Sequence, residues 1–191
     1  MAVKLITAPT QEPITLAEAK AQCRVDITTD DALIAGLVKA ARLYCEKISW
    51  RAFMRQTWEL WLDSWPASSF TLPFPPLYSV TSIKYYDTAD VEATLSTSIY
   101  YADTIATPGA IRLKYNQTWP STVLRTYNAV VVRFVAGYAT DEEVPQNFKQ
   151  AMLLLVGHWY ENREAVTLGT VSRQLELAVR TLLEIDRTFE Y

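Results

Sequence analysis

The 191-residue sequence has little of several residue types on which common chemistries depend, with one histidine, two cysteines and five glycines. Cys23 and Cys45 stand far apart and form no CxxC pair, so neither a disulfide framework nor a zinc site is expected. The glycines form no GxG or P-loop spacing, which argues against nucleotide binding by a glycine-rich loop. We therefore predict no cofactor and no metal.

The sequence also lacks a basic excess and a long hydrophobic run. Its 18 Lys and Arg are outnumbered by 21 Asp and Glu, and the basic residues are scattered along the chain. Tight binding of DNA or of an anionic membrane is not expected, although contact with DNA that slides past is allowed. The longest apolar run is about six residues, against roughly twenty for a bilayer span, and no signal-peptide pattern is present. A cytoplasmic product without a membrane span is expected.

The single histidine, His158, is the obvious catalytic candidate, and it lies in the stretch PQNFKQAMLLLVGHWYENREAV at residues 145–166. No GxSxG, HxxxH or ExxH pattern supplies a nucleophile or further metal ligands. Apolar residues recur there at helical spacing, which predicts a face that packs on another helix: Phe148, Met152, Leu155, Val156, Trp159 and Val166. We therefore expect His158 to be hydrogen-bonded within a helix–helix contact.

Two acidic residues near His158 are also candidates for catalysis. Glu161 and Glu164 are three positions apart and could in principle act as paired carboxylates. Because Arg163 lies between them, a solvated and partly ion-paired helix end is the better interpretation. No enzymatic activity is predicted.

Helical signals also mark both ends of the chain. A capping box at Thr15 and Glu18 predicts a short helix to about Val25. A second helix is predicted at residues 31–49, with a packed face made of Leu33, Ile34, Leu37, Val38, Ala41, Tyr44, Cys45 and Ile48. A further amphipathic segment starts at Val171, with apolar residues at helical spacing: Val171, Leu175, Ala178, Val179, Leu182 and Ile185.

Between these helices the hydrophobic period changes to two. QTWELWLDSW, from Gln56, predicts a strand, and the prolines of the following FTLPFPPL predict an edge or a connection. Its PxxP match is interpreted as this connection and not as an adaptor-domain ligand. Two hairpins are predicted, SVTSIKYYD with VEATL and SIYYAD with AIRLKY, followed by a last strand that ends at Gly137. The pattern indicates five or more short strands.

The predicted fold is α+β, a small antiparallel helical bundle with an inserted antiparallel β domain. The bundle takes residues 1–55 and 140–191, and the insert takes residues 56–139. The insert carries many aromatic residues, which pack under loops, lie at subunit contacts or form a sugar-binding platform. Our candidate contact residues are Trp61, Tyr86 and Trp119 in the insert and Val171, Leu175, Val179 and Leu182 in the C-terminal segment.

A succession of segments carries a family resemblance: ITLAEAKAQCRVD, TTDDALIAGLVKAARLYCEK, RQTWELWLDSWP, LPFPPLYSVTSIKYYD, WPS at 119–121, VVVRFVAGY and VPQNFKQAMLLLVGHWYENREAV. In this order they resemble the head–tail connector proteins, or head-completion adaptors, of long-tailed phages and gene transfer agents, in the subfamily with a β insert. The resemblance runs from about Ile14 to Val166. It departs from the family at Ile48-Ser49-Trp50, where members commonly have a glycine.

The resemblance implies a structural virion protein, assembled in the host cytoplasm and located at the head–tail junction. It implies a ring of twelve identical subunits that docks beneath the portal protein and presents a platform to a tail-side stopper or tail terminator protein. Double-stranded DNA would pass through the ring without sequence-specific binding, and no membrane partner is implied.

A closed ring needs two unlike contact surfaces on each subunit, for which the helical core and the aromatic insert are candidates. The C-terminal segment from Val171 to Tyr191 is expected to engage the portal or a neighbouring subunit. The alternative function is a β-rich binding module that holds carbohydrate or a host factor with exposed aromatic residues around Trp61 and Trp119.

Overall fold

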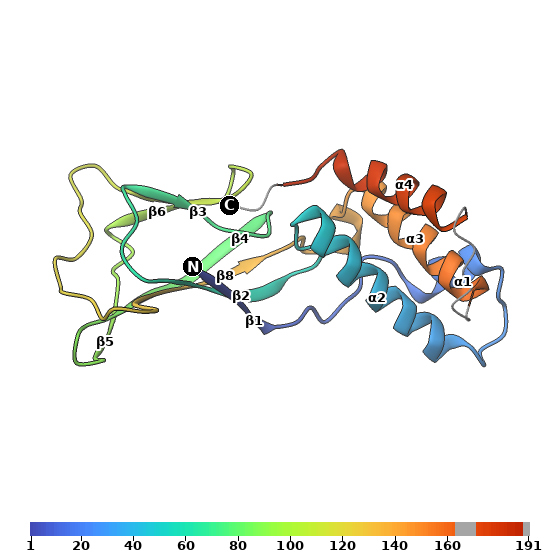
Figure 1. The fold of residues 1–191 in the computed structure, drawn as a ribbon, viewed down its shortest axis with the longest axis horizontal. Helices are drawn as coiled ribbons and strands as arrows, with labels where there is room; N and C mark the ends of the chain where they lie inside the picture. The colour runs from blue at the N-terminus through green and yellow to red at the C-terminus, as the bar shows by residue number, and fades with distance from the viewer. Residues whose placement is uncertain (163–170, 189–191) are drawn as a thin grey trace. The chain divides into compact units, whose positions relative to one another are not determined.

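The computed structural model describes residues 1–162 and 171–188 (Figure 1). The chain divides into two compact units, and each is built from separate stretches of sequence. The β unit contains Met1–Pro9 and Arg55–Gly137, and the helical unit contains Thr10–Met54 and Tyr138–Glu190. The chain therefore passes between the units three times.

The helical unit contains four α-helices and a short 3-10 helix among the described residues: α1 (Leu16–Cys23), α2 (Asp31–Ser49), η1 (Asp141–Glu143), α3 (Gln146–Glu161) and α4 (Val171–Glu184). The predicted capping box starts α1, because the Glu18 N–H donates to Thr15 Oγ1 over 3.1 Å and the Thr15 N–H donates to Glu18 Oε2 over 2.6 Å. After α2, Trp50 adopts a left-handed conformation with φ 55°, which favours glycine.

Helix α3 is the centre of the helical core and packs against α1, α2 and α4. The rings of Phe148 on α3 and Phe53 after α2 stack with centroids 4.6 Å apart. The predicted packing face of this helix is present, since Phe148, Met152, Leu155 and Val156 are buried and Trp159 packs against the core. Val166 lies outside the described residues. Leu33 of α2, predicted to be packed, is 41% exposed.

The β unit contains two antiparallel sheets. The five-stranded sheet has the order β1-β2-β8-β4-β5, and the three-stranded sheet has the order β3-β7-β6. The strands are β1 (Ala2–Thr7), β2 (Gln56–Leu62), β3 (Ser69–Thr71), β4 (Leu77–Tyr86), β5 (Glu92–Thr94), β6 (Tyr100–Asp103), β7 (Ala110–Leu113) and β8 (Val130–Ala136). The prediction of an α+β fold with an antiparallel β part is confirmed.

The sheet topology explains the proline run and corrects one assignment. The prolines from Pro73 to Pro76 connect β3 to β4, and the predicted hairpins are the pairs β4–β5 and β6–β7. Residues 1–9, which we had grouped with the helical part, belong to the β unit, because β1 pairs with β2 and places Leu5 opposite Trp58. This pairing joins segments about fifty residues apart, so a local hydrophobic pattern does not reveal it. Within the described residues, no helix is long and apolar enough to cross a bilayer.

Candidate subunit and partner surfaces

The side chain of Trp119 is held in the β unit by contacts within the same chain. Its indole Nε1 donates to the Ala67 carbonyl over 2.6 Å, and its ring stacks on Trp65 with centroids 4.9 Å and planes 4° apart. Phe70 and Tyr85 extend this aromatic cluster, at 6.2 Å from Trp119 and 5.5 Å from Trp65 respectively. The side chain is half-buried, so this aromatic residue packs under a loop and offers little of the open ring face that a sugar needs.

Tyr86 on β4 is also engaged within the chain. Its hydroxyl donates to Glu92 Oε2 over 2.7 Å, while Lys84 Nζ lies 2.7 Å from Glu92 Oε1. The Arg125 guanidinium lies over the Tyr86 ring, 4.1 Å from its centroid. The hydrogen bond to Glu92 raises the pKa of Tyr86, and the bonds from Lys84 and Tyr86 lower the pKa of Glu92. Tyr86 thus helps to hold β5 to the sheet.

Trp61, the third candidate of the insert, lies on β2 between Ala2 of β1 and Val131 of β8. Its side chain is half-buried. Together, the three aromatic candidates are part of the packing of the β unit, and each keeps only a fraction of its surface for a partner.

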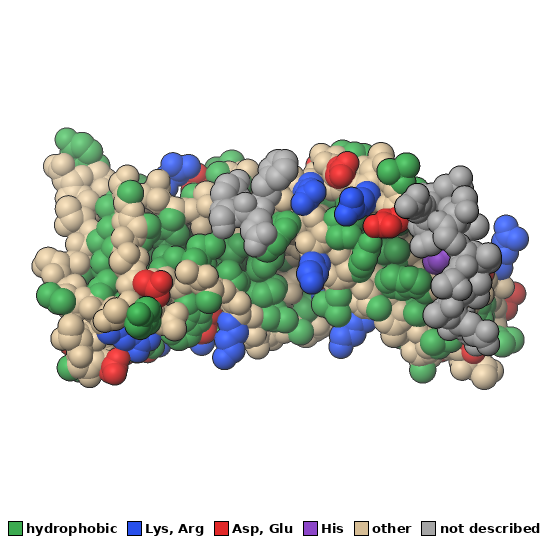
Figure 2. All heavy atoms as spheres, in the orientation of Figure 1, with side chains coloured by type: hydrophobic (Ala, Val, Ile, Leu, Met, Phe, Trp, Pro, Cys, Tyr) green, Lys and Arg blue, Asp and Glu red, His purple; other side chains and the backbone are tan. Residues whose placement is uncertain are grey.

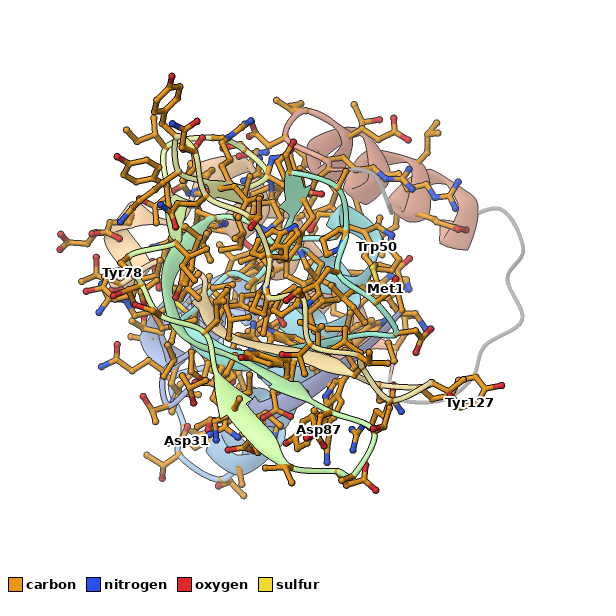
Figure 3. The ribbon with its side chains drawn as sticks, turned by 90° about the vertical axis from the view of Figure 1, so that its left-hand side faces the viewer. Met1, Asp31, Trp50, Tyr78, Asp87 and Tyr127 are labelled. Carbon is orange, nitrogen blue, oxygen red and sulfur yellow. The ribbon has the colours of Figure 1, made fainter. Side chains whose placement is uncertain are left out.

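A more exposed surface on the β unit is held in place by Arg125. This side chain donates to the carbonyls of Tyr127 and Asn128 and lies 3.1 Å from Asp90 Oδ1. The two neighbouring apolar side chains, Val123 and Tyr127, are 72% and 74% exposed. Figure 3 shows Tyr127 projecting from the β unit. Sequence reasoning missed this surface, because a loop pattern does not show that an arginine orders the loop.

The C-terminal candidate residues face their own helical unit. Val179 is buried, and Leu175 and Leu182 pack against the core. Asn147 of α3 fixes the end of α4, since its Nδ2 donates to the Leu182 carbonyl over 2.9 Å. The side chain of Val171 lies outside the description. The apolar face predicted to meet a partner is therefore used within the chain. Among the large apolar side chains that the structure describes, Leu177 on α4 and Ile185, directly after α4, are each 68% exposed.

Helix α2 also carries exposed apolar residues on the side away from the core. They are Leu33, Gly36, Ala40 and Leu43, which recur at spacings of three and four and thus share one face. Leu43 is 51% exposed, and a Cβ placed on Gly36 would have no atom within 4 Å. Figure 2 shows one face of the molecule, on which Lys and Arg side chains are scattered among hydrophobic ones and form no continuous basic patch.

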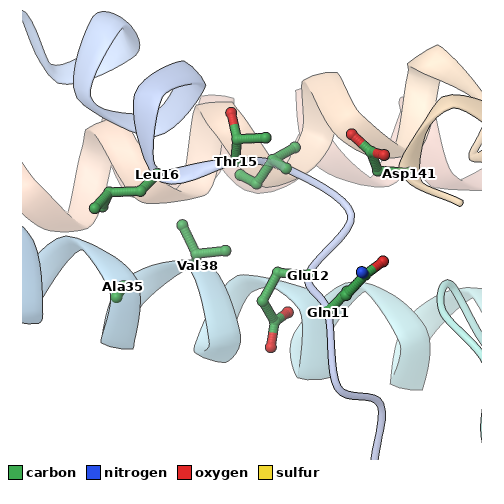
Figure 4. A pocket seen from close by; sticks show the side chains of 8 residues that line it. Gln11, Glu12, Thr15, Leu16, Ala35, Val38 and Asp141 are labelled. Atoms are coloured by element: carbon green, nitrogen blue, oxygen red, sulfur yellow. The ribbon is translucent and has the colours of Figure 1, made fainter.

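The helical unit also has an open hollow of about 440 Å³ between α2 and the segment that precedes α1 (Figure 4). Its apolar lining includes Ile14, Leu16 and Val38, and its carboxylates are Glu12 and Asp141. Glu12 already pairs with Arg42, whose Nε donates to it over 2.7 Å, and Asp141 lies 3.8 Å from Lys149 Nζ. Both carboxylates of the hollow are therefore already paired with basic side chains of the same unit.

The residues first considered for catalysis have structural surroundings. Asn162 Nδ2 donates to the His158 carbonyl over 2.9 Å and lies 3.3 Å from His158 Nδ1. Glu161 is exposed, and Glu164 lies outside the described residues. Both cysteines are free, and burial raises the pKa of Cys45 to about 12. Among the residues that the structure describes, no group of His, Cys, Asp and Glu is arranged to hold a metal ion.

Comparison with protein-family models matches residues 12–185 to the head completion protein family. This chain belongs to that family. The predicted family and the predicted function, a structural virion protein of the head–tail junction, are thereby confirmed. A comparison with curated proteins gives no match.

Three solved chains share the fold of this head completion protein. They come from the virion of a native gene transfer agent particle (TM-score 0.80), the neck of an empty particle with C6 symmetry (0.81) and the neck of a native particle with C12 symmetry (0.77). Each is 23% identical to this chain, and each alignment covers 100% of this chain and 97% of the other.

Proposed function

We propose that this head completion protein forms a ring of twelve subunits beneath the portal, where it presents a platform to a tail-side stopper or tail terminator protein. The main support is its membership of the family, together with a fold shared with chains from particle necks that have C12 and C6 symmetry. The role is structural, and it requires binding surfaces rather than a catalytic centre.

The charge of the protein suits a channel that DNA crosses. Its formal net charge is −3, so DNA meets no general excess of positive charge. Since affinity for duplex DNA grows with the number of phosphates neutralised, scattered basic residues hold it weakly. The DNA can therefore move through the ring without being retained.

The ring requires each subunit to present unlike surfaces to its two neighbours. The aromatic candidates Trp61, Tyr86 and Trp119 contribute only their exposed parts to such a surface. We assign the outward role to Leu177 on α4 and to Ile185 directly after it, because Val179 is buried in the subunit's own core. Of the other C-terminal candidates, Leu175 and Leu182 would then act mainly by placing this helix.

Electron microscopy of the purified protein mixed with its portal protein tests the proposal. We expect rings of twelve on the portal vertex, with density for both the helical and β units. A portal that carries no added ring at saturating protein would contradict the proposal. The double variant L177S/I185S, which keeps the buried face of α4, should weaken portal docking or ring formation if α4 faces a partner.

A further inference from the structure

The chain that follows α4 caps the end of another helix, α2. The backbone N–H of Thr188 donates to the Ser49 carbonyl over 3.1 Å, and the Thr188 hydroxyl donates to the Trp50 carbonyl over 3.0 Å. The last carbonyls of an α-helix have no partner inside the helix, so outside donors or water must satisfy them. Ser49 is completely buried and Thr188 is 9% exposed, so water has little access and Thr188 takes this role.

Two further side chains hold the same segment on the helical unit. Arg51, which follows the end of α2, donates from Nε to the Asp186 carbonyl. Asn147 of α3 donates from Nδ2 to Asp186 Oδ2 over 3.1 Å, in addition to the Leu182 carbonyl. The bonds of this segment join residues between 35 and 139 positions apart, so they form only in the folded unit.

These contacts lie where the chain leaves for the β unit and where it returns. Residues 50–54 lead from α2 to the β unit, and Tyr138 is the first residue of the returning chain. Tyr138 forms an isolated parallel β-bridge with Met54. Burial raises the pKa of Tyr138, and the nearby Arg51 guanidinium opposes that rise. Arg51 thus links the segment after α4 to both crossings of the chain.

We propose that residues 186–188 form a clasp, which locks these two crossings while it is seated on the end of α2 and frees them when it is drawn away. Without the clasp, the carbonyls of Ser49 and Trp50 lose their donor and Arg51 loses its acceptor. Trp50 has a left-handed backbone, which is unfavourable for a residue with a Cβ, so the end of α2 then rearranges.

The clasp couples the end of the chain to the crossings. Whatever pulls on the chain end loosens residues 50–54, and a change in those residues acts back on the chain end with the same free energy. This device goes beyond the proposed ring, and it operates within a single subunit.

Hydrogen exchange of the full-length protein, followed by nuclear magnetic resonance, tests the clasp. The variant T188V removes the hydroxyl and keeps the branched shape of the side chain. We expect the amides of Arg51 and Phe53, which are hydrogen-bonded to Glu46 of α2, to exchange about tenfold faster. The control T181V removes an exposed hydroxyl that donates within α4, and both amides should keep their wild-type rates.

The coupling is also measured from the crossing. R51M removes the donor to the Asp186 carbonyl, so the amide of Thr188 should exchange about tenfold faster. The control R55M removes an arginine that lies over the Tyr78 ring in the β unit, and it should leave the Thr188 amide unchanged.

Three results would overturn the clasp. The first is wild-type exchange at Arg51 and Phe53 in T188V, and the second is wild-type exchange at Thr188 in R51M. The third is an equal rise in T188V at the amide of Met152, which is completely buried in α3, because the hydroxyl would then support the whole unit rather than the crossings.

Discussion

Arg42 and Glu12 form an ion pair that joins α2 to the segment before α1. Arg42 Nε donates to Glu12 Oε2 over 2.7 Å, and its Nη1 donates to Glu46 Oε2 over 2.8 Å. Arg42 is 2% exposed, and the other oxygen of Glu46 accepts the Phe53 N–H over 2.8 Å. A single buried cation therefore fixes the chain where it enters the helical unit and where it leaves it after α2.

We expect R42M to lower the free energy of unfolding by about 3 kcal/mol, because it leaves two carboxylates without their buried partner. Urea denaturation followed by circular dichroism measures the effect. The control K39M removes an exposed positive charge from the same helix and should change stability by less than about 0.5 kcal/mol. Equal effects of the two variants would show that the Arg42 ion pairs do not stabilise the unit.

The Trp65–Trp119 stack should be visible spectroscopically. Two indoles at this distance couple their electronic transitions, so the pair should contribute a band to the circular dichroism of the wild-type protein whose sign is set by the in-plane rotation of one ring against the other. W119F should abolish that band while keeping most of the packing, and W119A should cost a further 2 kcal/mol or so through the cavity it leaves. A spectrum unchanged in W119F would contradict the stacked arrangement.

Helix α4 offers a matched pair of leucines for measuring its two faces. Leu183 is completely buried, so L183A should destabilise the protein by about 2 to 4 kcal/mol. Leu177 is 68% exposed, and L177A should leave the stability of the isolated subunit nearly unchanged. The same L177A should weaken ring assembly. Comparable destabilisation by both variants would mean that α4 lies differently on the core.

The carboxylate of Glu92 should titrate below the usual range of a glutamate. Lys84 and Tyr86 donate to its charged form and lower its pKa, so removing the tyrosine hydroxyl in Y86F should raise that pKa toward its ordinary value. Because the pKa is lowered in the folded state, the contact stabilises β5 above the unfolded pKa and is lost as the pH falls through the folded one. Nuclear magnetic resonance titration of the Glu92 side-chain carbon measures both values, and Y86F without any rise would exclude the hydrogen bond as a cause.

Local patterns were enough to predict the helices and most of the strands. The capping box at Thr15 and the apolar period of α3 depend on neighbouring residues, so sequence alone reveals them. The pairing of β1 with β2 depends on residues some fifty positions away, and no local period signals it. The family resemblance supplied the function, which no single residue pattern indicated.

The surfaces were harder to predict than the elements. An amphipathic pattern on α4 identifies an apolar face but does not say whether that face covers α3 of the same chain or another protein. Leu33 of α2 matches the spacing of the packed residues but lies at the margin of their face, where it is exposed. Which side of a helix stays exposed depends on how the neighbouring elements pack. In the same way, the stacking of Trp119 on Trp65 depends on the folded path of the loop that carries Trp119.

The threefold passage of the chain between its two units has a consequence for synthesis. Strand β1 is made first, but its partner strand β2 begins only at Gln56. Helix α2 packs against α3, which begins only at Gln146. At the usual rate of translation, the apolar side of α2 stays uncovered on the ribosome for roughly 5 to 20 s. Neither unit is complete until its late elements β8 and α3 have been made, so a subunit becomes competent to join a ring only after that point.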